Sequence, residues 1–572
     1  MNILGISCFY HDSAAALIRD GRLIAAAEEE RFSRKKHDSE FPERAVQFCL
    51  DTAGISINEV DHVVFYEKPF LKFERILMSS LATYPLSYKV FRESMITWLL
   101  DKLWVKTIIR DKLGIETEKI FFAEHHLSHA ASSFFCSPFE EAAILTTDGV
   151  GEWTTTSCGR GKGLEINLTR EIKFPHSLGL LYSAFTAFLG FRVNNGEYKV
   201  MGMAAYGKPR HVDKVYQLIN VEEDGGFRLN MEYFSFHHSL TRTYNNKFLE
   251  LFGDPRNPSD SDTPEPYYAD IAASIQTVTE EVLLKIARSL QKETGLKKLC
   301  IAGGVGLNSV ANWRLLNETG FEDIYIQPAS GDSGCAIGAC LYFYHAVLGK
   351  PRNFVMKHAY WGKEFSDDDI RTALKLDGAA YERIDNDDAL IDAAADLLVS
   401  GKVIGWYQGR FEWGPRALGN RSILADPRRA EMKNTINKKI KFREPFRPFA
   451  PSVLAEHAEE YFLLDRAQEH YPARFMLMVP PVREEKRSQI PAVTHVDGTG
   501  RMQMVYHETN PRYYSLIRRF KEKTGVPVIL NTSFNLRGEP IVASPADALL
   551  TFNRSDMDAL IMKNFIVRKG SK

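Results

Sequence analysis

The sequence predicts an α/β protein with an internally duplicated first part and a separate α/β domain at its end. Residues 3–30 give an apolar strand, a polar loop and a strand pair around a tight turn, and residues 142–170 repeat that order. The stretch at 350–368 is polar and aperiodic, as is typical of a linker, and an amphipathic helical pattern follows it. We therefore expect domains at residues 1–355 and 365–572.

Composition and charge narrow the class of protein. A chain of 572 residues is too long for one hydrophobic core, and 44% hydrophobic with 25% charged residues excludes extensive disorder. The net charge of −1 gives no whole-chain argument for binding nucleic acid or a membrane, and we expect neither. Seven cysteines without a CxxC pair favour free thiols in a reducing compartment. The first residues lack a basic signal-peptide region, so a cytoplasmic protein is expected.

One apolar run approaches the length of a membrane span. Residues 174–191, "FPHSLGLLYSAFTAFLGF", contain no Asp, Glu, Lys or Arg. Pro175, His176, two glycines and several hydroxyl groups interrupt the run. We expect a buried helix preceded by a loop.

Glycine-rich loops follow the apolar segments that end near residues 148, 303 and 330. Backbone amides in such loops, with a helix N-terminus behind them, can approach a nucleotide or a phosphate. The alternative is that the glycines only serve tight turns. The repeated strand, loop and hairpin order is similar to that of the actin, sugar-kinase and Hsp70-type ATPases, which hold a nucleotide between two lobes. Chance similarity of two hairpins is the alternative to that interpretation.

The stretch "AEHHLSHAASSFF" predicts half of a metal site. His125 and His129 are four residues apart, so on a helix both imidazoles lie on one face and can share a metal. His126 points about 100° away and is expected outside the ligand set. Asp148 and Asp332, each at a glycine-rich loop, would complete the set. Two histidines and two aspartates suit Fe²⁺, which we favour, or Mn²⁺, with Zn²⁺ as a further option. The alternative is two unrelated helix histidines and two turn-forming aspartates.

The C-terminal half contains a strongly basic segment. Residues 401–450 hold twelve Lys or Arg against four Asp or Glu, interleaved with glycine, proline and aromatic residues. This composition favours a shaped pocket for an anion over an ordinary solvated basic face.

Ordered stretches along the chain resemble the O-carbamoyltransferase family of nodulation-factor and antibiotic biosynthesis. They include "FYHDSAAALI", "EHHLSHAASSFF", "TTDGVGEW", "AGGVGLNS", "GRFEWGPRALGNRSILADPR", "IKFREPFRPFAPSV" and "LNTSFNLRGEPIV". The matches run from residue 4 to about residue 542. The resemblance implies an N-terminal half similar to the tRNA threonylcarbamoyl-transfer protein, an actin/Hsp70-like ATPase-type fold with a metal. It implies a C-terminal α/β domain similar to threonylcarbamoyl-adenylate synthase.

The resemblance also implies a two-step reaction. In the C-terminal domain, carbamoyl phosphate and ATP, with Mg²⁺ on the ATP, would give carbamoyl-adenylate, phosphate and pyrophosphate. In the N-terminal domain, the carbamoyl group would pass to a hydroxyl of a small sugar-like or polyketide acceptor. Residues 70–115 and 210–265 resemble insertions that could shape the acceptor site, and the acceptor itself is not named by the sequence.

Arginine forks and lysine charges are the groups that best hold such polyanions. The candidates for carbamoyl phosphate and ATP are Arg416, Lys439, Lys441, Arg443, Arg447, Asn531, Thr532, Ser533 and Asn535. Lys439 could equally be a solvated surface lysine. The four polar residues of "LNTSFN" could equally cap the end of a strand.

In the N-terminal half, the nucleotide is expected at the glycine loops. The candidate residues are Gly149, Val150, Gly151, Gly303, Gly304, Gly306, Asn308 and Gly331. Lys36 is expected to reach a phosphate, with Lys35 nearly as good a candidate. His11 and Asp12 are the catalytic candidates, His11 as the base for the acceptor hydroxyl, because an alcohol is a poor nucleophile without one. The alternative for His11 is a loop histidine bonded to backbone.

Other functions fit the sequence less well. The related hydrogenase-maturation carbamoyltransferase carries CxxC zinc fingers, which this chain lacks. A tRNA-modifying threonylcarbamoyl-type transferase and a non-catalytic nucleotide-binding regulator on the same fold are the remaining alternatives. A homodimer is expected only from the frequency of symmetric oligomers.

Overall fold

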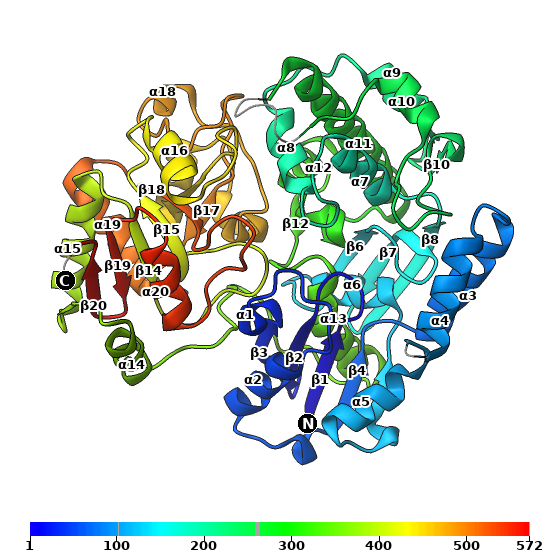
Figure 1. Cartoon of the computed structure of the whole chain (residues 1–572), viewed down its shortest axis with the longest axis horizontal. Coiled ribbons are helices and arrows are strands. Elements are labelled where there is room, and N and C mark those ends of the chain that lie inside the picture. Colours follow the sequence, from blue (N-terminus) through cyan, green and yellow to red (C-terminus); the bar gives the residue numbers. More distant parts are fainter. Residues whose placement is uncertain (101, 258–263, 571–572) are drawn as a thin grey trace. The chain divides into compact units, whose positions relative to one another are not determined.

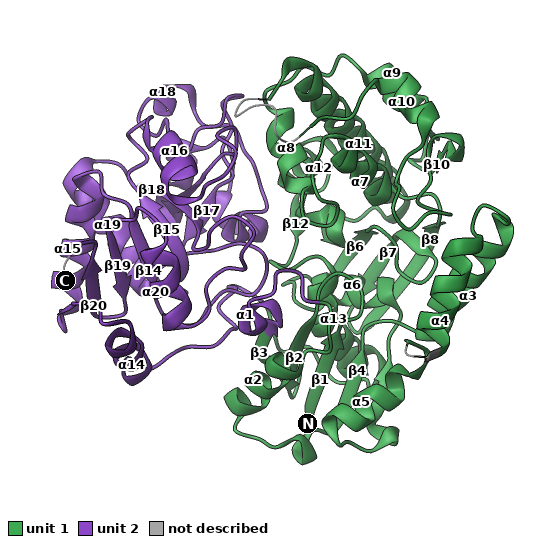
Figure 2. Cartoon of the chain, viewed as in Figure 1, with its two compact units in different colours: residues 1–26, 39–355 green, residues 27–38, 356–572 purple. Residues whose placement is uncertain are grey.

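A computed structural model describes residues 1–100, 102–257 and 264–570. The chain forms two compact units, coloured green and purple in Figure 2. Unit 1 comprises residues 1–26 and 39–355, and unit 2 comprises residues 27–38 and 356–572.

Unit 1 contains two five-stranded sheets with the same topology. The first has the order β3-β2-β1-β4-β5, and the second has the order β12-β11-β6-β7-β8. In each, the first three strands in sequence are antiparallel neighbours and the last two add in parallel. The repeated order confirms the predicted duplication.

The strands of the first sheet are β1 (Asn2–Ser7), β2 (Ala14–Arg19), β3 (Arg22–Glu28), β4 (His62–Phe65) and β5 (Ile120–Phe122). Those of the second are β6 (Glu141–Thr147), β7 (Thr154–Lys162), β8 (Glu165–Lys173), β11 (Lys298–Ala302) and β12 (Asp323–Tyr325). A separate hairpin pairs β9 (Ile219–Val221) with β10 (Phe227–Leu229).

Two helices pack together between these sheets. Helix α6 (His125–Phe134) follows the first sheet in sequence but packs on β6 and β11 of the second. Helix α13 (Cys335–Tyr342) follows the second sheet but packs on β1 and β2 of the first. Gly338 makes the contact between the helices close, because a Cβ atom there would overlap the carbonyl oxygen of Ser128. The position of the metal-ligand candidates on α6 therefore depends on a small residue at this point of α13.

The remaining helices of unit 1 are α2 (Glu43–Ala53), α3 (Pro69–Ala82), α4 (Tyr88–Leu100), α5 (Val105–Leu113), α7 (Leu178–Phe188), α8 (Glu197–Ala204), α9 (Val212–Tyr216), α10 (Asn246–Phe252), α11 (Pro266–Thr294) and α12 (Ser309–Glu318) (Figure 1). Helix α7 confirms the buried helix predicted within 174–191. In the described part of the chain, none of the helices combines the length and apolar character that a membrane crossing requires.

Unit 2 is built on one eight-stranded mixed sheet with the order β13-β20-β19-β14-β15-β18-β16-β17. Its strands are β13 (Glu382–Arg383), β14 (Ile404–Tyr407), β15 (Arg421–Ala425), β16 (Ala450–Leu454), β17 (Gln503–Val505), β18 (Val528–Ser533), β19 (Ala559–Met562) and β20 (Phe565–Arg568). Its helices are α1 (Glu30–Ser33), α14 (Asp367–Asp377), α15 (Asp387–Val399), α16 (Met432–Thr435), α17 (Ala458–Tyr461), α18 (Glu484–Arg487), α19 (Pro511–Thr524) and α20 (Pro545–Asn553).

Residues 27–38 belong to unit 2 although they come near the start of the chain. The Oε1 atom of Glu28 accepts a hydrogen bond from the backbone N–H of Gly414 at 2.8 Å. The Nη2 atom of Arg31 donates to the carbonyl oxygen of Gly414 at 2.6 Å. Arg34 donates to the carbonyl of Ile541 at 2.7 Å. This exchange could not be predicted, because local patterns do not show which core a short segment joins.

We expect the Gly338→Ala substitution to destabilise unit 1. The added methyl group must separate α13 from the backbone of α6, and overpacking of this kind costs about 1–3 kcal/mol. Urea denaturation would measure the change in the free energy of unfolding. Gly226→Ala is the control, because its Cβ atom would meet only the ends of the flexible Asp224 and Glu222 side chains. Equal stability of the two variants would contradict the close helix contact.

Candidate functional site

The two predicted histidine ligands lie at the beginning of α6. His125 and His129 are buried on the same face of the helix, and their Nε2 atoms are 3.1 Å apart. The carboxylate of Glu152 accepts a hydrogen bond from the backbone N–H of His125 at 3.0 Å and so holds the first turn of the helix. His126 points elsewhere, with its Nδ1 atom 2.7 Å from the hydroxyl of Thr146.

Two carboxylates from separate loops complete this cluster. Asp148 follows β6, and Asp332 lies in the loop before α13. One donor atom from each of the four side chains lies within 4.8 Å of all the others. The Nε2 atom of His125 is 3.3 Å from Asp148 Oδ2, and the Nε2 atom of His129 is 3.4 Å from Asp332 Oδ1. The structure therefore brings all four predicted ligands together.

The chemistry of the four side chains fits a divalent cation. Burial alone would raise the pKa values of Asp148 and Asp332, but the neighbouring histidines hold both below the ordinary value, so both carboxyls are ionised. Neither Oδ atom of Asp332 has a hydrogen-bond partner among the described residues, although both are buried. Buried charges of this kind require a counter-charge. A cation between two imidazoles and two carboxylates would supply it.

The predicted glycine loops converge on the same cluster. The backbone N–H of Gly304 donates to Asp148 Oδ1 at 2.8 Å, and the N–H of Gly303 donates to the carbonyl of Ser330 at 2.8 Å. A Cβ atom on Gly151 would lie 2.8 Å from Cδ2 of the His125 ring. Glycine is therefore needed where the loop after β6 passes the histidine.

The other loop candidates have structural roles. Val150 is buried, and the carbonyl of Gly306 accepts a hydrogen bond from Asn312 at 2.9 Å. Asn308 caps α12, with its side chain accepting the N–H of Ala311 at 3.1 Å, and its amide also bonds Gln276. Gly149 contributes its carbonyl oxygen to the hydroxyl of Ser177 at 2.7 Å, and Gly331 directly precedes Asp332.

The catalytic candidates lie beside the metal-ligand cluster. His11 and Asp12 are in the loop after β1, with His11 Nδ1 2.8 Å from Asp12 Oδ2 and His11 Nε2 3.5 Å from Asp332 Oδ2. Burial lowers the pKa of His11, but the charges of Asp12 and Asp332 outweigh it and raise that pKa to about 10. A cation bound by Asp332 would offset part of the negative charge that stabilises protonated His11, and would therefore favour neutral His11.

Four further residues of the site were not singled out in the sequence. The buried Lys72 on α3 pairs with Glu67 at 2.6 Å, and Glu67 Oε2 is 4.0 Å from His125 Nδ1. Arg75, also on α3, donates to the carbonyl of Gly151 at 2.7 Å. Glu152 follows the first glycine loop in "GVGEW", which was the only local signal for any of them. Together they fix the loop after β6 and the start of α6.

In unit 2, Lys441 is the centre of a group of cations. Its Nζ atom donates to the carbonyls of Ser533 and Asn535 at 2.7 and 2.8 Å and to Asn535 Oδ1 at 2.6 Å. Burial, followed by the charges of Arg443, Arg447 and Lys36, holds the pKa of Lys441 well below its ordinary value.

Lys36 therefore belongs to unit 2, where its charge acts on Lys441, whereas the sequence placed it among the nucleotide candidates of the N-terminal half. The physical reason is that residues 27–38 join the core of unit 2. A concentration of positive charge of this kind suits a ligand with several negative charges.

The remaining candidates in unit 2 differ in their surroundings. Asn531 is buried, and its Nδ2 atom donates to Ser452 and to Gln503, each at 3.1 Å. Thr532 lies in the β-ladder opposite Ile423. Arg416 is partly exposed on the loop before β15, whereas Lys439 is exposed, which favours the solvated interpretation of that lysine.

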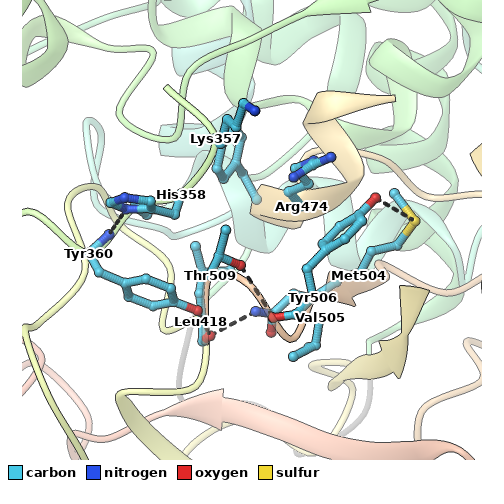
Figure 3. Close-up of a pocket in the computed structure, with 12 residues that line it drawn as sticks. Lys357, His358, Tyr360, Leu418, Arg474, Met504, Val505, Tyr506 and Thr509 are labelled. Carbon is cyan, nitrogen blue, oxygen red and sulfur yellow. Dashed lines mark hydrogen bonds between the residues drawn. The ribbon is translucent and has the colours of Figure 1, made fainter. Parts of the chain in front are cut away.

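A small pocket adjoins the Asn531 network (Figure 3). The carbonyl of Leu418 in its wall accepts a hydrogen bond from Gln503 Nε2 at 2.7 Å, and Gln503 also bonds Asn531. On another wall, the guanidinium of Arg474 lies 3.9 Å from the centre of the Tyr506 ring. The Nε and Nη1 atoms of Arg474 are buried and have no hydrogen-bond partner among the described residues. The pocket thus offers aromatic surface and hydrogen-bond donors beside the polar network.

Comparison with known proteins identifies both parts of the chain. The model for the carbamoyltransferase N-terminus matches residues 2–341, and the model for the carbamoyltransferase C-terminus matches residues 395–569. Among solved structures, HypF of T. kodakarensis aligns with 61% of this chain and 48% of its own at 12% identity and a TM-score of 0.30. The fold assignment therefore rests on the strand order given above.

Curated relatives cover nearly the whole chain. The uncharacterized protein sll1178 of Synechocystis sp. is 50% identical over 100% of this chain and 97% of its own. The nodulation protein NolNO of Sinorhizobium fredii is 39% identical over 98% of this chain and 79% of its own. The 3'-hydroxymethylcephem-O-carbamoyltransferase of Streptomyces clavuligerus is 35% identical over 44% of each chain. This chain is accordingly a transferase and belongs to the carbamoyltransferase family.

Proposed function

We propose that this protein is an ATP-dependent O-carbamoyltransferase with one reaction step in each unit. Unit 2 converts carbamoyl phosphate and ATP into carbamoyl-adenylate, and unit 1 transfers the carbamoyl group to a hydroxyl of a small sugar-like or polyketide acceptor. The observation that carries the proposal is the group of cations around the buried Lys441, because it calls for a polyanionic ligand. The relative from Streptomyces clavuligerus, named 3'-hydroxymethylcephem-O-carbamoyltransferase, supports a hydroxyl acceptor.

In unit 2, the cations hold the phosphates of both substrates. Lys441 is held by the carbonyls of Ser533 and Asn535, and in this proposal it contributes its charge to the phosphate site rather than a direct hydrogen bond. Arg443 and Arg447 supply the forked donors that fit phosphate oxygens. Water cleaves the O–P bond of carbamoyl phosphate, which gives carbamate and inorganic phosphate. With the oxygens of ATP neutralised, a carbamate oxygen then attacks the α-phosphorus, from which pyrophosphate leaves. The Mg²⁺ that accompanies ATP would share this role.

In unit 1, His125, His129, Asp148 and Asp332 would hold a divalent cation, with Fe²⁺ favoured and Mn²⁺ or Zn²⁺ as alternatives. When bound, it supplies Lewis acidity toward the carbamoyl carbonyl or the adenylate phosphate. In this proposal the glycine loops at 149–151 and 303–306 lie against the adenylate. The amides of Gly303 and Gly304 are already bonded to Ser330 and Asp148, so they shape the site rather than bind the phosphate.

In this proposal His11 and Asp12 handle the acceptor proton. The Nε2 atom of His11 faces the metal-ligand cluster, and Asp12 bonds Nδ1 and so fixes the ring. In its neutral form His11 accepts the proton of the acceptor hydroxyl as that oxygen attacks the carbamoyl carbon. AMP is then the leaving group, and Asp12 stabilises the imidazolium that forms.

The ligand set predicts a specific loss of metal. We expect the double variant His129→Ala/Asp332→Ala to lose bound metal, because only two of the four donors remain. Elemental analysis by mass spectrometry, after anaerobic purification with Fe²⁺, measures both content and identity. His126→Gln is the matched control on the same helix, since His126 bonds Thr146 instead, and it should keep its metal. One metal per chain in the double variant would disprove the assignment.

Polyanion binding in unit 2 should be accompanied by proton uptake. The pKa of Lys441 is depressed in the free protein, and bound phosphates would raise it, so between the two values the amine gains a proton. Titration calorimetry with ATP, at a series of pH values below the ordinary lysine pKa and in buffers of different ionisation enthalpy, measures the uptake. Lys441→Met should abolish it, whereas Lys438→Met, an exposed neighbour, should not. Proton release by the unaltered chain would contradict the proposal.

The proposed first step is tested by pyrophosphate release from ATP. We expect release that depends on added carbamoyl phosphate and falls about 100-fold in Lys441→Met, because one positioned cation is lost. Asp332→Asn should retain this release but lose carbamoyl transfer. A metal-loaded chain that releases no pyrophosphate in the presence of carbamoyl phosphate would refute the adenylate mechanism.

A further inference from the structure

The helical hairpin of α3 and α4 has an inverted distribution of polarity. On the inner side of α3, Lys72 and Arg75 are buried. On its outer side, Phe70 is 71% exposed and Leu81 is 56% exposed. An ordinary surface helix shows the opposite arrangement, with apolar residues inside.

The buried contacts fix which side of α3 faces outward. Lys72 pairs with Glu67 at 2.6 Å, and Arg75 donates to the carbonyl of Gly151 at 2.7 Å. Rotating the helix to cover its apolar side would break both contacts and expose buried partners. The outward apolar side is thus held in place by the interior of unit 1.

The exposed apolar side chains of α3 form one stripe. Phe70, Leu71, Met78 and Leu81 are all exposed and recur at helical spacing, so they lie within one sector of the helix. Glu74 is exposed in the same sector.

The stripe continues through the turn and along α4. Tyr84 and Leu86 in the turn are 68% and 71% exposed. On α4, Tyr88, Ile96 and Leu99 are 58%, 55% and 54% exposed and share one sector. Figure 1 shows the two helices together at the edge of unit 1. We call this combined outer surface of α3, the turn and α4 the hairpin face.

The hairpin face is large for a monomer. Its apolar side chains are 38% to 71% exposed, and a large side chain has roughly 150–250 Å² to bury. The face therefore offers on the order of 1,000 Å² of apolar surface. The largest apolar patch of a typical monomer covers about 300–600 Å². A stable interface buries about 800 Å² on each partner.

We propose that the hairpin face binds the same face of a second copy of this chain. A two-fold axis would set two antiparallel helix pairs against each other as a four-helix arrangement, which buries both apolar stripes. Exposed Glu74 on α3 is opposite in charge to exposed Lys89 and Arg92 on α4, so α3 of one copy against α4 of the other brings unlike charges together. Glu74 within the apolar stripe disfavours a lipid surface, which attracts cations.

Sedimentation velocity on the full chain, from about 0.1 to 50 µM, tests the proposal. We expect a dimer whose dissociation constant rises on the order of 100-fold or more in Leu81→Glu/Ile96→Glu, because carboxylates would be buried in the interface. Leu376→Glu in unit 2 is the matched control, since Leu376 is 83% exposed and outside the hairpin face. It should remain dimeric.

A second variant separates loss of the dimer from loss of the fold. Tyr84→Glu/Leu86→Glu changes only the exposed turn and should give monomers with an unchanged thermal midpoint. A full chain that is monomeric over this range would overturn the proposal, as would either double variant remaining a dimer. Sedimentation of monomeric chain with phosphatidylcholine vesicles would assign the face to a membrane surface and also overturn it.

Discussion

Unit 1 is organised around the negative charge of two aspartates that are buried among histidines. Asp148 and Asp332 are buried carboxylates, and the donor atoms around them lie within 4.8 Å of one another. Burying such a group without a partner costs several kcal/mol. The surrounding arrangement follows from this constraint, because α6, the glycine loop at 303–306 and the loop after β1 each supply a group directed at one of the two carboxylates. A cation there satisfies the ligands and ties together segments that are far apart in sequence.

The duplicated topology explains how these segments meet. In each sheet, three antiparallel strands are followed in sequence by two parallel strands. The helix that comes next in the chain packs on the other sheet. Helices α6 and α13 therefore pack back to back, and their N-terminal ends lie close to the loops that carry Asp148 and Asp332. Close packing is permitted by small residues, above all Gly338 against the backbone of Ser128. The packing of α6 against α13 therefore also determines where the metal-ligand candidates lie.

Much of the fold and the metal-ligand cluster could be predicted because their signals are local. The i, i+4 spacing of His125 and His129 and the placement of Asp148 and Asp332 on glycine loops are visible in short windows. The basic inner side of α3 could not be predicted, because Lys72 and Arg75 look like solvated helix residues until their partners Glu67 and Gly151 are placed. That Lys36 belongs to unit 2 could not be predicted for a related reason, since Lys441, on which its charge acts, is about 400 residues away in sequence.

The exchange of residues 27–38 makes the two units interdependent at the level of the chain. Strand β3 ends at Glu28. The residues that follow, which include Arg31, Arg34 and Lys36, belong to unit 2, and the chain returns to unit 1 at Ser39. A fragment beginning at residue 356 would therefore lack a cation of the proposed polyanion site and the contacts to Gly414. Residues 27–38 therefore link the unit proposed to make the adenylate to the unit proposed to consume it. A mixed anhydride is readily hydrolysed. A chain whose two units cannot be separated keeps the synthesis and the use of such an intermediate in one molecule.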